Sequence, residues 1–281
     1  MKLKSFSVEI LKECDPADRT TIPEEVYEQY ELLSEELESL NNPDGEPVNI
    51  PFTKKYEVAD NSEFKIVGSF NSGKTTACNA LQIVKSVVTN KPFINNDNIT
   101  KIIVMMDNGV SYEVQLNQCK IVNETFSVGE TNISSSTGEH TSFLFNSITS
   151  HKLSDAIPYH ADFIKFFEDT LVLSPKHILS NELNYDEMLN SDILASVTPD
   201  LGLVNWDVPP IKMPNTNILD EITFKGKSLN TYSVNTRIIL VALIFFKFGS
   251  LVVLDDVPTD VIEVIKEHMP KEKELIYTSY K

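Results

Sequence analysis

The chain has 281 residues, 41% of them hydrophobic and 23% charged, which is typical of a globular protein with a large core. It has only 9 glycines and 14 prolines, so a low-complexity or fibrous chain is excluded. The three cysteines, Cys14, Cys78 and Cys119, share no close spacing, so neither a disulfide framework nor a zinc site is predicted. The opening residues lack the pattern of a signal peptide, and we expect a cytoplasmic protein without a membrane span.

The formal net charge of −17 is concentrated in one segment. Between Glu13 and Glu46 there are twelve acidic residues and one basic residue, Arg19, so this segment alone carries −11. Its helical pattern predicts either a solvated helix or an acidic face that docks a basic partner. Strong nucleic-acid binding needs a dense basic surface, and base reading often uses arginine, of which the chain has only Arg19 and Arg237. We therefore expect nucleic-acid binding to be weak or indirect.

Four stretches before residue 90 are predicted as regular structure. Lys2 to Leu11 alternates polar with apolar residues, which predicts an amphipathic strand. Thr21 and Glu24 have the spacing of a capping box, which predicts a helix that ends near residue 40. Phe64 to Val67 has the pattern of a short strand, and it runs through a glycine turn into a predicted helix from Gly73 to Val88.

The middle of the chain predicts an antiparallel subdomain over residues 99–128. Ile99 to Met106 and Val110 to Leu116 are joined by Asp-Asn-Gly, a strong hairpin signal. Cys119 to Val128 adds a third strand. Gly129 to Glu139 is rich in serine, threonine and glycine, which predicts a mobile loop.

The second half of the chain predicts a helical lobe followed by alternating helices and strands. Helices are expected at 154–170, 184–194, 234–246 and 258–268, strands at 251–254 and 274–277, and an irregular proline-rich segment at 197–217. The longest apolar run, Ile238 to Leu254, is interrupted by Lys247 and Gly249, so a buried helix followed by a buried strand explains it better than a membrane span.

One motif carries most of the functional information. Residues 68–75 spell Gly-Ser-Phe-Asn-Ser-Gly-Lys-Thr, a full G-x-x-x-x-G-K-T between a predicted strand and a predicted helix. Glycines let backbone N–H groups approach a polyphosphate closely, and the helix N-terminus adds positive potential. The alternative is a tight turn that spells the motif by chance. The predicted nucleotide-binding residues are Gly68, Ser69, Asn71, Ser72, Gly73, Lys74, Thr75 and Thr76.

Within this motif two side chains have separate expected roles. Lys74 is expected to reach the β- and γ-phosphates, and the Thr75 hydroxyl to coordinate Mg²⁺.

Two acidic residues follow a buried strand near the end of the sequence. Leu251 to Leu254 are four apolar residues, which predicts a parallel strand buried on both faces. Ligands of open α/β sheets bind beyond the carboxyl ends of the strands, where Asp255 and Asp256 follow. Asp255 is expected to hold Mg²⁺ through water, and Asp256, with Lys74, is a candidate catalytic residue that orients the attacking water. The alternative is that both acids only cap the helix that begins at Pro258.

Three further segments resemble one superfamily. Tyr232-Ser-Val-Asn-Thr-Arg237 resembles the L-S-x-G-x-x-R signature that opens a helix directly before the metal-binding strand of ABC-type ATPases. The opening MKLKSFSVEIL is similar to the first strand of SMC, RecF and OLD-like ATPases of this superfamily. Leu153 to Glu168, with Leu171 to Pro175, is similar to a pattern typical of compact ABC-type ATPases in bacterial toxin and phage-defence operons.

This resemblance implies an α/β P-loop NTPase fold of ABC-ATPase type, a single domain over 1–281 with a mixed central sheet. Within it, 12–50 is an acidic helical insertion, 99–128 an antiparallel β subdomain and 153–217 a helical lobe. ATP and Mg²⁺ are the implied cofactors. The implied partners are a second copy of the chain and a protein effector such as a nuclease. ATP would be sandwiched in that dimer, with Ser233 and Asn235 facing the nucleotide on the opposite protomer.

Three positions depart from the ABC-type pattern. Asn235 replaces the signature glycine, Asp256 replaces a glutamate with a shorter carboxylate, and Ser279 replaces a histidine. Loss of one positioned group typically lowers a rate by ~10²–10³, so slow turnover is expected. Two functions follow: a slow Mg²⁺-dependent ATPase that controls a partner effector in phage defence, or a nucleotide-gated scaffold with little or no hydrolysis.

Overall fold

The computed structural model describes residues 1–14, 48–58, 62–68, 73–136, 138–142, 144–145, 157–176, 206–207, 223–224, 227–246 and 249–280. The chain divides into two compact units. The parallel-sheet unit comprises Met1–Lys2, Val58–Lys85 and His160–Lys281, and the antiparallel-sheet unit comprises Leu3–Glu57 and Ser86–Tyr159. Each unit has a main sheet and buried apolar residues of its own, so the protein is of mixed α/β class.

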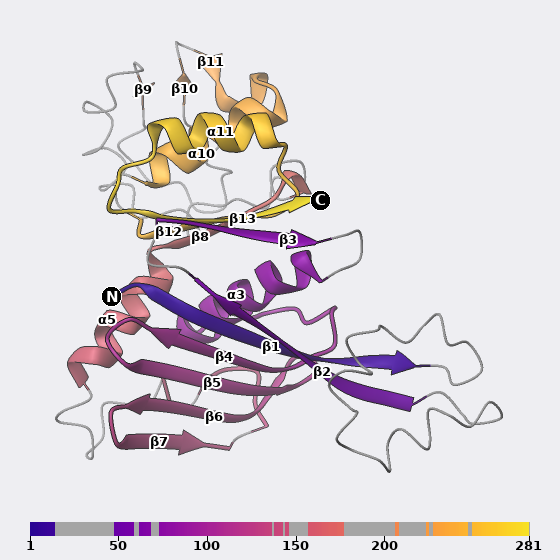
Figure 1. Ribbon diagram of the computed structural model, residues 1–281. Helices are drawn as coiled ribbons and strands as arrows, with labels where there is room; N and C mark the ends of the chain where they lie inside the picture. Colours follow the sequence, from indigo (N-terminus) through magenta and orange to yellow (C-terminus); the bar gives the residue numbers. More distant parts are fainter. Residues whose placement is uncertain are drawn as a thin grey trace. The chain divides into compact units, whose positions relative to one another are not determined.

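The antiparallel-sheet unit is built on six strands in the order β2-β1-β4-β5-β6-β7 (Figure 1). These strands are β1 (Leu3–Cys14), β2 (Val48–Glu57), β4 (Ile99–Met106), β5 (Val110–Asn117), β6 (Lys120–Val128) and β7 (Thr131–Ser135). Burial alternates along β5, where Val110, Tyr112 and Val114 are fully buried, because alternate side chains of a strand face one side of the sheet. The predicted hairpin is confirmed, and Gly109 in its turn has a φ of 83°, which glycine adopts without strain.

Two strands of this sheet differ from the sequence prediction. The prediction of a mobile loop at Gly129–Glu139 is wrong, because β7 lies within it and pairs with β6. Glu124 is opposite Ser135 at one end of this pairing, and Val128 is opposite Thr131 at the other. The hydroxyls of Thr125 and Ser134 are hydrogen-bonded across this pair at 2.9 Å, so polar residues form an edge strand without an apolar alternation. β2 was not predicted, and it pairs with β1 along ten residues. Between these two strands, residues 15–47 of the predicted acidic insertion lie outside the described residues.

Four parallel strands form the centre of the parallel-sheet unit, in the order β3-β13-β12-β8 (Figure 1). They are β3 (Glu63–Gly68), β8 (Thr170–Leu173), β12 (Leu251–Leu254) and β13 (Glu274–Tyr280). Every residue of β8 and β12 is buried, as is typical of a parallel sheet covered on both faces. The predicted strand at Leu251–Leu254 is confirmed. β8 lies inside the range 153–217, so its four residues belong to the central sheet and not to a helical lobe.

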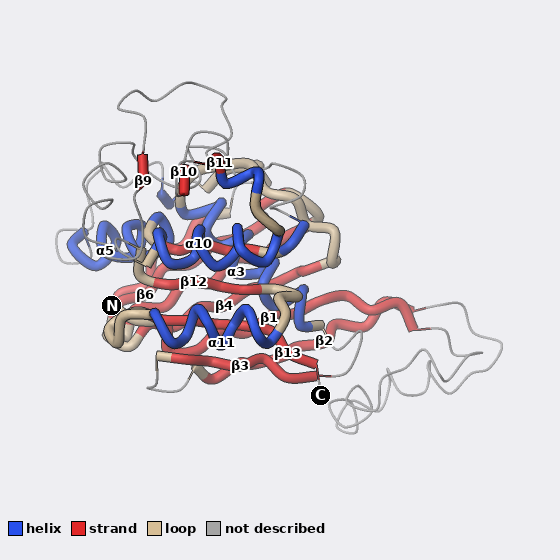
Figure 2. Tube along the Cα trace, turned by 90° about the horizontal axis from the view of Figure 1, so that it is seen from above, coloured by secondary structure: helices blue, strands red, loops and turns tan. Residues whose placement is uncertain are grey.

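Helices cover both faces of the parallel sheet. α10 (Val234–Phe245) and α11 (Thr259–His268) lie side by side across one face, as Figure 2 shows, and α3 (Lys74–Val88) starts on the other face (Figure 1). Apolar residues of α10 and α11 share one core cluster with alternate residues of the strands, among them Val252 and Leu254. The apolar run of the sequence is therefore a buried helix and strand, as predicted. Within the described residues, no helix combines the length and apolarity needed to cross a bilayer.

Smaller elements complete the described chain. α5 (Ile157–Glu168) lies within the predicted helix at 154–170, and a short 3-10 helix, η3 (Leu229–Thr231), precedes α10. β9 (Trp206–Asp207), β10 (Thr223–Phe224) and β11 (Lys227–Ser228) form a small three-stranded sheet. The predicted helices near 24–40 and at 184–194, and most of the predicted irregular segment at 197–217, lie outside the described residues.

Candidate functional site

The carboxyl ends of the parallel strands define one edge of their sheet, and the predicted site residues gather there. β3 ends at Gly68, β12 ends at Leu254, and β13 lies between these two strands. Gly68 pairs in register with Tyr280 at the end of β13. This edge is where open α/β sheets bind their ligands. The fold therefore brings residue 68 and residue 255 to the same edge of the sheet although they are far apart in sequence.

Lys74 is held close to the end of β3. Its ammonium is in a side chain only 7% exposed, and Nζ donates to the Gly68 carbonyl oxygen at 2.9 Å. Gly73 has a φ of 78°, a left-handed conformation that glycine adopts freely, and nothing within 4 Å would meet an added Cβ there. The glycine is thus required by the backbone turn into α3 and not by crowding. Predicted residues Ser69, Asn71 and Ser72 lie outside the described residues.

α3 begins at Lys74, and its first turn contains no acidic side chain. Thr75 and Thr76 belong to that turn, and the Gly73 carbonyl accepts the first helical bond from Ala77 N at 3.0 Å. The positive end of a helix dipole favours an anion, and an acidic residue in the first turn would compete for it. The first turn of this 15-residue helix therefore contains no acidic residue that would compete with an anion.

Asp255 is the central carboxylate of the site. It is 7% exposed, and its Oδ1 accepts hydrogen bonds from the Thr75 hydroxyl at 3.3 Å and the Thr278 hydroxyl at 3.2 Å. Its backbone N–H donates to the Leu173 carbonyl of β8 at 2.9 Å, which fixes the main chain at the end of β12. The Thr75 bond joins residues 180 positions apart, so the lysine-threonine end of α3 and the acidic end of β12 form one cluster.

Asp256 follows directly in an unusual conformation. Its φ is 55°, in the left-handed region that aspartate tolerates better than most residues. Its backbone N–H donates to the Thr278 hydroxyl at 2.9 Å, while its side chain is exposed. The carboxylate predicted to orient the attacking water thus lies at the surface, next in sequence to the buried Asp255.

Two residues of the site were missed by sequence reasoning as contributors to it. Thr278 contacts both aspartates, although its only sequence signal is its place before Ser279, the residue that replaces a histidine of the ABC-type pattern. Cys78, one turn into α3, is fully buried. Burial raises the pKa of the Cys78 thiol well above its ordinary value, and the charge of Asp255 and a hydrogen bond to Asp255 raise it further. The thiol therefore stays protonated and is a third donor to Asp255.

Ser233 and Asn235 lie at the start of α10. Ser233 is its N-cap, and the Ser233 hydroxyl accepts a hydrogen bond from Thr236 N at 3.2 Å. Both side chains are exposed, and the first turn of α10 has no acidic residue. The local role of Ser233 is therefore helix capping. Its contact with a nucleotide on a second protomer stays a prediction.

A divalent cation fits this site only with help from a ligand. Among the described residues, no group of three or more histidine, cysteine, aspartate or glutamate side chains could hold a metal ion. Mg²⁺, however, usually keeps several waters and binds one or two carboxylates together with substrate phosphates. Asp255 and the Thr75 hydroxyl are such a set, because both are oxygen ligands at one place. The donors present fit Mg²⁺ bound together with a polyphosphate.

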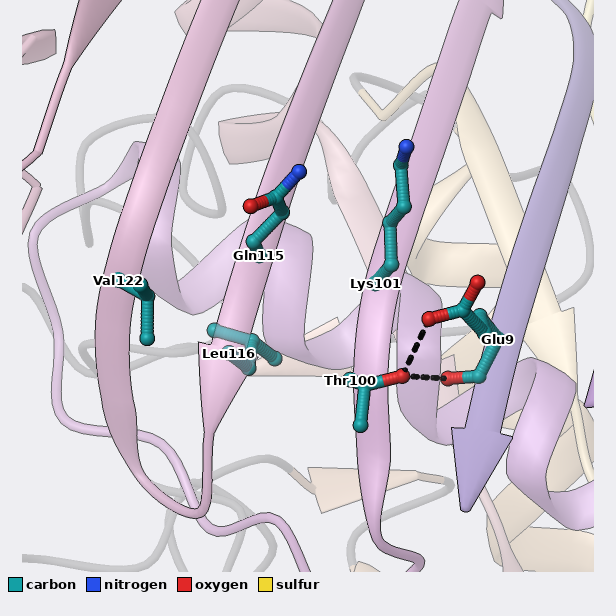
Figure 3. Close-up of a pocket in the computed structure, with 6 residues that line it drawn as sticks. All are labelled: Glu9, Thr100, Lys101, Gln115, Leu116 and Val122. Carbon is teal, nitrogen blue, oxygen red and sulfur yellow. Dashed lines mark hydrogen bonds between the residues drawn. The ribbon is translucent and has the colours of Figure 1, made fainter. Parts of the chain in front are cut away.

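A separate hollow of about 410 Å³ lies on the antiparallel sheet (Figure 3). Its lining residues are Glu9, Thr100, Lys101, Gln115, Leu116 and Val122. The Thr100 hydroxyl donates to the Glu9 carboxylate at 2.7 Å, and Lys101 Nζ lies 2.9 Å from a Glu113 carboxylate oxygen. Both charged groups of the hollow already interact with neighbours in the sheet, as is ordinary for a solvated sheet face. The cluster at Asp255 is therefore the stronger candidate site.

Comparisons with known proteins give a distant likeness. No family model matches the chain, and no curated protein matches it. Among solved structures, the chain is similar to one described as "Crystal structure of the SmcHead bound to the C-winged helix domain of ScpA". The identity is 10% and the TM-score 0.46, and the match covers 99% of this chain and 90% of that chain. The identity of the site therefore rests on contacts within this chain.

Proposed function

We propose that the protein binds ATP together with Mg²⁺ at the carboxyl edge of its parallel sheet and hydrolyses the nucleotide slowly. The observation that carries this proposal is the cluster of Lys74, Thr75 and Asp255, joined by the hydrogen bond between Thr75 and Asp255. A glycine turn, a lysine and a helix N-terminus suit a polyphosphate, and a hydroxyl beside a carboxylate suits its cation.

Each residue has a distinct role in this proposal. Lys74 Nζ exchanges the Gly68 carbonyl for phosphate oxygens, because a charged ammonium binds an anion more strongly than a neutral carbonyl. Thr75 and Asp255 hold the cation, Asp255 through water. Bound Mg²⁺ supplies neutralisation of the phosphate charge. Asp256 orients the attacking water from the exposed side of the site.

The proposal extends to assembly and biological role through the ABC-type resemblance. ATP would be held between two copies of the chain, with Ser233 at the start of α10 facing the γ-phosphate on the opposite copy. The dimer would control a protein effector such as a nuclease, in phage defence. Comparison of the native mass with and without Mg·ATP tests the first of these steps: a doubled mass on ATP addition supports it, and an unchanged mass contradicts it.

The test of nucleotide binding is the substitution Lys74→Ala. We expect the affinity for a fluorescent ATP analogue to fall by about 100-fold, because a buried charge-assisted contact is lost. Lys65→Ala is the matched control, since Lys65 is an exposed lysine of the same strand-to-helix unit, on β3, and should bind as the natural chain does. Equal affinity of the two variants in the titration would contradict the proposal.

A nucleotide-gated scaffold is the second candidate function. It is favoured by the exposed position of Asp256 and by its short side chain, which reaches less far than a glutamate toward an attacking water. Phosphate release separates the two candidates. An ATPase loses its release rate in Asp256→Asn, whereas a scaffold binds ATP and releases no phosphate in either form.

A further inference from the structure

We propose that Thr278 is a positioning residue that orients Asp255 for its cation and thereby sets the Mg²⁺ affinity of the site. This inference rests on the proposed function, because it assigns a role within the same nucleotide site. It concerns a residue on β13, a strand that carries neither the glycine-lysine turn nor the acidic pair.

The Thr278 hydroxyl uses both of its hydrogen-bonding capacities inside the site. It donates its single proton to Asp255 Oδ1 at 3.2 Å and accepts the backbone N–H of Asp256 at 2.9 Å. The side chain is 3% exposed, so water does not readily replace it. One hydroxyl thus fixes the carboxylate of one aspartate and the main chain of the next.

The strand order explains why the Thr278 hydroxyl reaches both aspartates. β13 lies between β3, which leads into the glycine-lysine turn, and β12, which leads into the two aspartates. Thr278 pairs with Ile66 of β3, while Tyr277, its neighbour, pairs with Leu254 of β12. Thr278 therefore lies one residue past the end of β12, at the level of Asp255.

Cation binding changes the balance of donors at Asp255. In the described arrangement, the hydroxyls of Thr75 and Thr278 both donate to the same oxygen, Oδ1. Thr75 would be a ligand of a bound cation, and its hydroxyl would then be less available as a donor to Asp255. Thr278 has no such second task, so it continues to hold the carboxylate while the metal is bound. Second-layer donors of this kind commonly change metal affinity by ~10–100-fold when removed.

The alternative is that Thr278 only fills space in a buried strand. Valine has nearly the same shape as threonine and favours strands equally, so Thr278→Val preserves the packing and removes only the hydroxyl. Thr278→Ser keeps the hydroxyl and removes a methyl group. A role in packing predicts that serine is the worse substitute, whereas a role in positioning predicts that valine is worse.

The experiment measures the Mg²⁺ concentration that gives half-maximal binding of a fluorescent ATP analogue, and separately the binding of that analogue in EDTA. We expect the Mg²⁺ midpoint to rise about tenfold in Thr278→Val and by less than about twofold in Thr278→Ser, with binding in EDTA unchanged in both. Thr278→Ala, which also lacks the hydroxyl, replaces the valine variant if thermal melting shows that valine impairs folding.

The outcomes separate this inference from the proposed function. If the natural chain binds nucleotide but the hydroxyl-free variants keep its Mg²⁺ midpoint, or if serine shifts it as much as valine does, the positioning role of Thr278 is overturned alone. If the natural chain binds no nucleotide in either condition, the proposed function is overturned and this role with it.

Discussion

Two carboxylates with little or no exposed surface, one in each unit, are both surrounded by hydrogen-bond donors. Glu124, in the middle of β6 in the antiparallel-sheet unit, is 0% exposed. It accepts bonds from the Tyr112 hydroxyl at 3.0 Å, the Ser142 hydroxyl at 2.6 Å and the Leu144 N–H at 2.8 Å. Burial and the nearby charge of Glu124 raise the pKa of Tyr112 well above its ordinary value, so this phenol remains a donor. Asp255 is enclosed in a similar way by hydroxyl groups.

The difference between the two lies in their surroundings along the sheet. Glu124 lies within a strand, and its donors come from the next strand and from the segment that it pins to the sheet. Asp255 lies just past the end of a parallel strand and accepts a hydrogen bond from Thr75, which follows the buried Lys74 at the start of a helix. Burial and hydrogen bonding are therefore shared by Glu124, which anchors a segment to its sheet, and by Asp255, the carboxylate of the candidate site. The position at the carboxyl edge of a parallel sheet distinguishes them.

The largest expected effect is a loss of stability when the buried carboxylate of Glu124 is removed. Glu124→Leu leaves three buried donors without their acceptor, and each such loss costs about 1–3 kcal/mol, so we expect a decrease of about 3 kcal/mol or more in the free energy of unfolding. Urea denaturation measures it. Glu113→Leu on the outer face of β5 is the control, because its pairing with Lys101 is partly exposed and should contribute less than about 1 kcal/mol. A loss in the Glu124 variant no larger than in the control would contradict the anchor role.

The second prediction tests the other carboxylate. Asp255→Asn keeps an oxygen that accepts from Thr75 and Thr278, so we expect little change in stability but a rise of about tenfold or more in the Mg²⁺ midpoint of nucleotide binding. Asp260→Asn, an exposed acid in the first turn of α11, is the control and should leave the midpoint unchanged. If Asp255→Asn unfolded the protein as Glu124→Leu is expected to, Asp255 would be an anchor as well.

The smallest expected effect concerns a buried base. Burial lowers the pKa of His160 to about 4, against about 6.5 in an unfolded chain. Between pH 6.5 and about pH 4 the unfolded chain protonates this histidine, whereas the folded chain keeps it neutral. The free energy of unfolding therefore has its full value above pH 6.5 and decreases as the pH falls toward 4. We expect the free energy of unfolding, measured by urea denaturation, to be about 1 kcal/mol lower at pH 6 than well above pH 6.5.

The matched variants for this pH dependence are His160→Met and His268→Met. His160→Met should remove the decrease between pH 6.5 and pH 4, whereas His268→Met, an exposed position on α11, should retain it. Parallel slopes for the two variants would show that another group controls stability in this range.

Local patterns in the sequence predicted the elements that have strong periodicity or apolar runs. The hairpin around Gly109, the helix at Val234–Phe245 and the buried strand at Leu251–Leu254 belong to this class. β7 does not, because an exposed edge strand of polar residues has no apolar alternation to detect. β8 has only four residues, too few to distinguish a buried strand from part of a helix.

The candidate site was predictable as far as its motif extends. Residues 68–75 and Asp255 were indicated by residue type and by the strands expected before them, and the Thr75–Asp255 contact joins the two. Thr278 and Cys78 were not, because their roles depend on contacts with residues distant in sequence and on strand order. Threonine in a strand and cysteine in a buried helix are too ordinary to be noticed without that order.

The place of β13 in the sheet has a consequence for how the site is assembled. β13 (Glu274–Tyr280) pairs with both β3 and β12. It therefore connects the strand that leads into the glycine-lysine turn with the strand that leads into the two aspartates. A chain cut before Glu274 would keep the glycine-lysine turn and both aspartates yet have no backbone ladder between them. The pairing of β13 with β3 joins residues far apart in the sequence, and pairings of this kind slow folding, so we expect a low folding rate for this sheet.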